Sequence, residues 1–480
     1  MAALKFTHIL PVIVAVSLMV SGCSMKTDLG QSDLAIAARW HETLPHGGQS
    51  ANMLSWWQSF GDSSLLQLIE LAQNENPDLA SAAADIEKAR ATLASSRAAL
   101  LPSLDGSGAV DVSGTEGDRA NRVTESTTTS GGLDASWELD LFGKNRSKRQ
   151  AARERLGKQV ANWHDARVSL AAEVADDYVQ YRACRQLVGI YQQELVSQRE
   201  TINATAKAVG SGFSSSSDLA LAKASAASSA STLTEQKAEC KILVKTIAQL
   251  TGGDETRVIR LLDKGRSSIP HPKTFNVNRV PADALRQRPD IQSLEREVAA
   301  SMAEVGAANA DLYPSLTLGG SITLSTSTLI GQSAPWSFGP ALSLPLFDGG
   351  TRRAAVKSSI ADYHSAVASY KSGVLSAVRE VETALVHVNS TSLRMSDVKD
   401  AAENYRSHFT AIDTNWKAGN ASLLDREDAR RSALSAEVTL IEIRRDATRY
   451  WISLYKALGG GWQSGKDSAF PEKNIGSRQK

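Results

Sequence analysis

The three cysteines of this 480-residue chain are the side chains whose positions most clearly point to chemistry. Cys23 follows a run of small residues and an apolar segment, Ile9 to Val20, which is too short to span a bilayer. This order is typical of a bacterial lipoprotein signal, in which residues 1–22 are removed and the cysteine thiol accepts a diacylglyceryl group. We therefore predict that Cys23 is lipidated. An aspartate after the cysteine would resemble the signal for retention in the inner membrane, but Ser24 follows Cys23, so we expect the acyl chains to anchor the protein in the outer membrane. A plain signal peptide followed by an unmodified Cys23 is the alternative.

Cys184 and Cys240 are the remaining cysteines, and they lie symmetrically about Gly212. Each is 28 residues from this glycine, so both would lie at the same height in a helical hairpin that turns at Gly212. Disulfides form and persist in the oxidising periplasm. The spacing therefore predicts a Cys184–Cys240 disulfide, and two buried free thiols are the alternative.

The other polar residues form no recognisable catalytic site. The eight histidines are scattered, without a His-Glu-x-x-His sequence or a close cluster of histidines and cysteines. The formal net charge of +1 provides no basic field that would attract nucleic acid. We therefore expect no enzyme activity, no cofactor and no metal; a lipid-anchored hydrolase of the cell envelope is the enzyme alternative.

The elements that position these residues come in two copies. Landmarks recur in one order at offsets of 205 to 212 residues: Asn76-Pro77-Asp78 and Arg288-Pro289-Asp290, Pro102 and Pro314, Leu141-Phe142 and Leu346-Phe347, and Gly212 and Gly419. Such self-similarity predicts two structural repeats. The expected organisation is a lipidated segment over 23–61, repeats over 62–252 and 281–460, an equatorial connector over 253–280 and a tail over 461–480.

Each repeat contains two segments in which apolar and polar residues alternate, as in strands with one apolar and one polar face. The predicted strands cover about 103–114, 131–142, 315–326 and 337–347. Each is long enough for a tilted transmembrane strand, which needs about 9–11 residues. A half-buried sheet of a soluble protein is the alternative.

The connections between these strands also follow from composition. Segments 116–129 and 326–336 are predicted to be exposed hairpin loops, and Pro340 and Pro345 place the fourth strand at an edge or a bulge. Four strands cannot close a membrane-spanning barrel, whose smallest known form has about 8 strands. The chains are therefore expected to oligomerise and share strands.

Long proline-free runs follow the strands of each repeat. From Gly143 to about Val209, and again after Pro345, apolar residues recur at spacings of three and four, which indicates helices packed along a coiled-coil-like seam. A 67-residue helix would be roughly 100 Å long. Turn signals near Gly212 and Gly419 predict an antiparallel helical hairpin in each repeat, with its tip at that glycine. A bundle folded on itself is the alternative.

These motifs together resemble the TolC family, and more narrowly its NodT/OprM-type outer-membrane efflux lipoproteins. The resemblance covers about 50–460 and rests on the lipobox at Cys23, Trp56-Trp57, Phe60-Gly61-Asp62, the two motifs at Pro77 and Pro289, Tyr313-Pro314-Ser315-Leu316 and Leu346-Phe347-Asp348-Gly349-Gly350. It implies a mainly α-helical homotrimer with a transmembrane β part. The trimer would form a 12-stranded β-barrel, four strands per chain, that continues into a periplasmic α-helical barrel.

The resemblance also implies a function. The chain would be the outer-membrane channel of a tripartite efflux system in a Gram-negative bacterium, a passive exit duct for drugs or other toxic small molecules. Its partners would be a periplasmic adaptor protein and an inner-membrane pump of the resistance-nodulation-division class. A type I secretion duct for polypeptides and a structural envelope lipoprotein without a pore are the alternatives.

The family's gate lies at the periplasmic hairpin tips, and its residues correspond to Asp425 and Asp428, six and nine positions after Gly419. The family's clasp between hairpins corresponds to Asp218 and Trp416. Ala421 stands where the resemblance calls for a basic clasp residue, so Arg426 and Arg430 are the candidate replacements. For Asp218 and Asp425, capping of the following helix is the alternative role.

Overall fold

The structure, a computed structural model of the chain, describes residues 41, 53–117, 122–265, 267–272 and 285–461. The predicted lipidation site Cys23 and residues 462–480 of the predicted tail lie outside this part. In chain order, the principal elements of the first repeat and the connector are η2 (Met53–Phe60), α2 (Ser63–Glu75), α3 (Pro77–Ala98), β1 (Ser103–Gly117), β2 (Arg122–Leu139), α4 (Lys144–Gly210), α5 (Ser216–Leu250) and α6 (Glu255–Lys264), of which α6 belongs to the connector. After it come α8 (Pro289–Ala310), β3 (Ser315–Ser327), β4 (Gly331–Ser333), β5 (Trp336–Ser343), α9 (Thr351–Lys417), α10 (Leu423–Ala457) and η3 (Gly459–Gly461).

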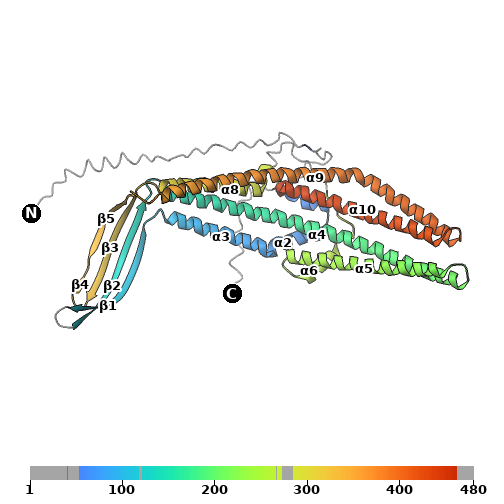
Figure 1. Cartoon of the computed structure of the whole chain (residues 1–480), viewed down its shortest axis with the longest axis horizontal. Helices are drawn as coiled ribbons and strands as arrows, with labels where there is room; N and C mark the ends of the chain where they lie inside the picture. Colours follow the sequence, from blue (N-terminus) through green and yellow to red (C-terminus); the bar gives the residue numbers. More distant parts are fainter. Residues whose placement is uncertain (1–40, 42–52, 118–121, 266, 273–284, 462–480) are drawn as a thin grey trace, which may run out of the picture. The chain divides into compact units, whose positions relative to one another are not determined.

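The expected duplication is confirmed by the lengths of these helices. The short helices α3 and α8 have 22 residues each. The long helices α4 and α9 have 67 each, and the returning helices α5 and α10 have 35 each. Each short helix begins with a proline, whose fixed φ and missing N–H suit the first helical position. The same order of helix, strands, long helix and returning helix therefore occurs twice (Figure 1).

The chain divides into two compact units. The first contains Ala84–Val160 and Ser293–Lys371, and so holds every strand of the described residues with the adjoining parts of four helices. The second contains Ala161–Gln292 together with the described residues of 35–83 and 372–480, and so holds both hairpin tips. The long helices α4 and α9 each contribute to both units.

The strands of the first unit form one antiparallel sheet in the order β1-β2-β3-β5, with β4 paired to the far end of β3 (Figure 1). The register places the apolar residues of neighbouring strands opposite one another, as in Leu133 opposite Ile322 and Leu316 opposite Leu342. Side chains of this face are exposed, including Leu104, Val112, Leu133, Leu324, Phe338 and Leu342. The predicted alternation thus produces an apolar sheet face with no cover from the described part of this chain.

The strand bounds differ most from the prediction at three places. β2 begins at Arg122 rather than near 131, so the connection after Gly117 is much shorter than the predicted loop. The Thr- and Ser-rich segment 122–130 pairs with β1, since β-branched threonine suits a pleated strand. β5 ends at Ser343 rather than near 347, two residues before Pro345, which has no N–H to donate. The predicted second loop also contains a short strand, β4.

An aromatic cluster joins the N-terminal segment to the last helix in the second unit. The ring of Trp56 stacks on Tyr455 with the centroids 4.7 Å apart, and Phe60 packs edge-on against Trp56. Asp62 accepts hydrogen bonds from the first backbone amides of α2 and, at 2.5 Å, from the Tyr178 hydroxyl of α4. The Trp-Trp and Phe-Gly-Asp motifs therefore act as structural anchors.

Candidate functional site

The two hairpin tips have the same backbone geometry. Gly212 and Gly419 lie in the turns and adopt positive φ angles of 77° and 81°. In each turn the amide one residue after the glycine reaches back to a carbonyl of the preceding long helix, from Phe213 to Ala208 and from Asn420 to Asn415. Only glycine adopts this left-handed conformation without strain, which explains why both tips have one at this point.

Each returning helix begins with a capping box at these tips. The hydroxyl of Ser215 accepts from the Asp218 amide and the Asp218 carboxylate accepts from the Ser215 amide, both at 3.1 Å. Ser422 and Asp425 make the same pair of bonds at the same distances. The Ser214 hydroxyl and then Ser215 lower the pKa of Asp218, and the Ser422 hydroxyl lowers the pKa of Asp425. Both aspartates therefore cap a helix in this structure.

Asp428 lies one helical turn beyond Asp425 on α10. Its exposed carboxylate accepts a hydrogen bond at 2.6 Å from Arg431, which is also exposed. Such a surface pair is weak and leaves the carboxylate accessible to solvent and ions. Asp425 and Asp428 are thus two exposed carboxylates at the start of one helix, and their role as a gate stays a prediction.

Trp416 lies near the end of α9, where it meets Arg426 of α10. The Arg426 guanidinium carbon is 4.7 Å from the centre of the Trp416 ring, a cation–π contact. The same guanidinium donates to Asp413 at 2.6 Å and to the Thr201 hydroxyl of α4 at 2.8 Å. Arg426 therefore links the second hairpin to the first, whereas Asp218 bonds within its own turn.

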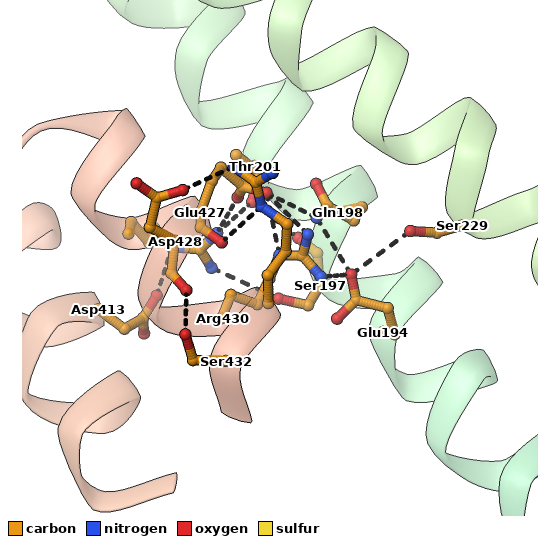
Figure 2. A network of polar contacts seen from close by, with 12 residues as sticks. Glu194, Ser197, Gln198, Thr201, Ser229, Asp413, Glu427, Asp428, Arg430 and Ser432 are labelled. Carbon is orange, nitrogen blue, oxygen red and sulfur yellow. Dashed lines mark hydrogen bonds and ion pairs between the residues drawn. The ribbon is translucent and has the colours of Figure 1, made fainter. Parts of the chain in front are cut away.

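A buried polar network continues from this point (Figure 2). Its centre is Glu427 of α10, which is only 1% exposed. The Glu427 carboxylate accepts from Gln198 of α4 at 2.9 Å and from Arg430 at 3.0 Å. Gln198 also donates to Glu194 at 3.1 Å, and Glu194 forms an ion pair with Arg430. The network thus ties α4 to α10 by charged side chains that lie away from solvent.

The burial of these groups determines what the network can do. Desolvation, and then the neighbouring Arg431, lower the pKa of Arg430 to about 10, which still leaves it charged at neutral pH. Replacing one partner of a buried ion pair leaves an uncompensated charge, which costs about 3–5 kcal/mol. Any movement that separates the two hairpins here must break these bonds or solvate the charges. The arrangement can therefore act as a latch.

A disulfide joins Cys184 of α4 to Cys240 of α5, with the Cα atoms 5.7 Å apart. It lies within the first hairpin, between its tip and the connector. The second hairpin has no cysteine at either equivalent position, because all three cysteines of the chain lie before residue 241. The covalent link therefore stiffens one hairpin only.

Several residues of the site were missing from the sequence prediction. No sequence motif marks Glu194, Gln198, Thr201 or Glu427. One signal was nevertheless present in α4, where polar residues continue the apolar stripe at spacings of three and four: Glu194, Gln198, Thr201 and Thr205. All four are buried. Polar residues at buried helical positions require partners from another helix. That signal can locate such a network but cannot identify its partners.

Two further properties concern the described residues as a whole. No group of three or more His, Cys, Asp and Glu side chains among them could hold a metal ion. In the same part of the chain, no helix contains an apolar stretch long enough to cross a membrane.

Comparison with known proteins gives consistent results along nearly the whole chain. The model of the outer membrane efflux protein family matches residues 68–253 and 280–460. Nodulation protein T of Rhizobium leguminosarum bv. trifolii is 30% identical over 93% of this chain and 96% of its own length. The solvent efflux pump outer membrane protein SrpC of Pseudomonas putida is 28% identical over 93% of this chain and 97% of its own. The open state of the MtrE outer membrane channel of Neisseria gonorrhoeae superposes with a TM-score of 0.81, at 26% identity, over 92% of this chain and 99% of that one.

Proposed function

This chain belongs to the outer membrane efflux protein family, and we propose that it acts as a homotrimeric exit duct for toxic small molecules. Its fold and most of its length match outer-membrane efflux channels. Such a duct is passive, so its physical tasks are to cross the outer membrane and to control an opening at the hairpin tips. The energy for transport would come from an inner-membrane pump.

The observation that carries this proposal is the incomplete sheet. Its outer strands, β1 and β5, each pair on one side only within the described residues, and its apolar face is exposed. Unpaired strand edges and exposed apolar faces are both costly in water. Pairing of β1 with β5 of a neighbouring copy would close the sheet and turn the apolar face toward lipid.

The carboxylates at the tip of the second hairpin support a gate. Three copies would place six carboxylates, from Asp425 and Asp428, around one opening, since each chain contributes two. A ring of acidic side chains attracts cations and is costly to desolvate. We therefore assign the periplasmic aperture to these two residues.

The buried network supports a latch that differs from the expected one. The predicted clasp of Asp218 and Trp416 would join the two hairpins, but each of these side chains contacts its own hairpin: Asp218 caps α5, and Trp416 stacks with Arg426. Within one chain, Arg426 takes the basic role, because it stacks on Trp416 and bonds Thr201 of the other hairpin. Opening would then require Arg426 and Glu427 to release α4.

The expected protein partners follow from the location of the duct between the outer membrane and the periplasm. A duct that ends in the periplasm needs an adaptor protein to connect it to a pump, and we propose a pump of the resistance-nodulation-division class. The solvent efflux relative supports small apolar toxicants as the cargo. Lipidation of Cys23 would anchor each chain to the outer membrane. Labelling with a palmitate analogue tests this, and an unlabelled chain would refute it.

Ion conductance tests the duct itself. Purified protein added to planar lipid bilayers should produce discrete current steps, which a structural lipoprotein without a pore would not. Deleting the gene should then increase susceptibility to solvents, dyes and antibiotics. Normal susceptibility together with loss of a secreted polypeptide would instead favour a type I secretion duct.

A further inference from the structure

The first turns of α4 carry an exposed basic face. Arg149 and Arg153 are exposed, and neither has an ion-pair partner among the described residues. Arg146 lies on the same face, because spacings of three and four residues bring side chains to one side of a helix. Its exposed guanidinium pairs with Asp140.

The opposite face of this helix is occupied by other contacts. Ala151 and Ala152 are buried. Helix α8 packs closely against this face, because a Cβ atom added at Gly306 would lie 3.2 Å from the hydroxyl oxygen of Ser147. The nearest acidic side chain on the helix, Glu154, receives a hydrogen bond at 2.8 Å from Arg296 of α8. Asp311 of α8 pairs with Lys144 and Arg352. The acids close to the start of α4 are therefore already used by other cations.

The order of side chains along the chain is the second observation. β2 ends at Leu139, and Leu141 and Phe142 follow with 48% and 46% of their surface exposed. The Phe142 ring stacks on Tyr313 with the centroids 4.8 Å apart. α4 begins at Lys144, so Arg149 and Arg153 lie about 8 and 14 Å along the helix from its start. The chain thus passes from an apolar strand to an aromatic pair and then to basic side chains. This order matches the layers of a membrane, which are the hydrocarbon core, the interface and the headgroups.

The second repeat has the same order. Leu346 and Phe347 follow β5 and are 86% and 94% exposed. Arg353 and Lys357 then lie exposed in the first turns of α9, without an ion pair among the described residues. Arg353 occupies the position of Arg146, since the long helices are related by an offset of 207 residues. The first turns of the two long helices, which lie in one compact unit, therefore carry basic side chains next to exposed apolar ones.

We propose that these residues form a binding surface for anionic phospholipid headgroups of the periplasmic leaflet of the outer membrane. The surface consists of Arg149, Arg153, Arg353 and Lys357, and it rests on the proposed membrane insertion of the sheet. Long basic side chains extend their charged ends toward headgroups while their stems lie along apolar surface. Each basic group close to an anionic lipid surface adds attraction, and arginine pairs with phosphate in a bidentate way. The surface would fix the depth at which the sheet lies in the bilayer.

Lipid selectivity tests this proposal. Wild type and the variant Arg149→Gln/Arg153→Gln would be reconstituted into phosphatidylcholine vesicles that contain spin-labelled phosphatidylglycerol or spin-labelled phosphatidylcholine. The measured quantity is the relative association of the two labelled lipids with the protein. Wild type should associate more with labelled phosphatidylglycerol than with labelled phosphatidylcholine. In the variant this ratio should fall roughly tenfold. A variant with wild-type preference would overturn the proposal.

Four controls separate this result from other causes. Arg199→Gln/Arg394→Gln removes two exposed arginines of the second unit and should keep the wild-type preference. Arg149→Lys/Arg153→Lys should restore most of the preference, because it restores the charge. Flotation with pure phosphatidylcholine vesicles reports insertion of the sheet; failure of wild type there would refute the proposed function instead. Loss of the preference in inorganic phosphate, but not in chloride of equal ionic strength, would indicate a free-phosphate site and overturn the lipid assignment.

Discussion

Asn76 and Arg288 perform the same task in the two repeats with different chemistry. The Asn76 amide donates to the carbonyl of Leu250 at 3.0 Å, and the Arg288 guanidinium donates to the carbonyl of Ala457 at 2.7 Å. These carbonyls are at the ends of the equivalent helices α5 and α10. Carbonyls at helix C-termini lack partners within the helix, so each repeat uses the residue before its Pro-Asp motif to satisfy one.

Replacing these two residues should destabilise the protein to different extents. Asn76→Ala removes the cap of α3 and the bond to α5, which should cost about 1–2 kcal/mol. Arg288→Ala should cost more, because Asp290 and Glu380 also lose their shared partner. Thermal unfolding in detergent measures both. Arg286→Ala, an exposed neighbour, is the control, and an equal loss for Arg286→Ala and Arg288→Ala would contradict the capping role.

Breaking the buried network should loosen the contact between the hairpins. Glu427→Ala removes the carboxylate that accepts from Gln198, Arg426 and Arg430, which should cost about 3–5 kcal/mol. Glu194 then remains as the only acidic partner of Arg430 among the described residues. Hydrogen exchange should accelerate for the α4 amides around Gln198, and the channel should open more often in bilayers. Glu403→Gln, at an exposed position of α9, should change neither quantity. Unaltered exchange in Glu427→Ala would rule out a latch at this point.

The aperture and the helix cap can be separated at Asp425. Asp425→Asn/Asp428→Asn should weaken block by divalent cations and change single-channel conductance, because it removes the acidic ring. Ser422→Ala removes the cap partner of Asp425 but retains its charge. It should therefore lower stability by about 1 kcal/mol and leave divalent block intact. If the two variants had the same effect on block, the carboxylates would act through helix structure alone.

The Cys184–Cys240 link should stabilise the first hairpin. It closes a loop with a sequence separation of 56, and the chain-entropy model gives about 4 kcal/mol for a loop of this size. Cys184→Ser/Cys240→Ser should therefore unfold at lower temperature while keeping the secondary structure. Peptide mapping without reductant checks the bond in protein purified from the cell envelope. Free thiols at both positions would contradict the oxidised state.

Asp177 should make stability depend on pH. Burial raises the pKa of Asp177 to about 6, and Asp176 and Glu173 add to the effect. Its unfolded pKa is about 3.9, so the folded state binds more protons between about pH 4 and pH 6. Stability from this group is therefore present below that window and lost as pH rises through it. Asp177→Asn should exceed wild type in melting temperature at about pH 8 but not at about pH 4.

The exposed Asp397→Asn is the matched control for that experiment. It should give the same difference from wild type at both pH values. A pH-independent difference for Asp177→Asn would show that its carboxyl titrates as an ordinary surface aspartate does.

The sequence alone determined the repeat architecture, because periodicity is a local property that one strand or one helix carries by itself. Alternation from Leu133 to Leu139 predicted a two-faced strand, and proline-free apolar stripes predicted the long helices. The motif resemblance then indicated the family. The predicted start of the second strand near residue 131 was wrong, since the threonine-rich segment before it suits either a loop or a strand and here pairs with β1.

The tertiary structure alone decided which polar groups meet. Arg426 and Thr201 are 225 residues apart, and nothing in either local pattern relates them. Their contact depends on the axial register of α4 against α10, and a shift of one turn, about 5.4 Å, would give each a different partner. The fold could therefore be predicted from local patterns, whereas the contacts of the proposed latch could be identified only from the packing of α4 against α10.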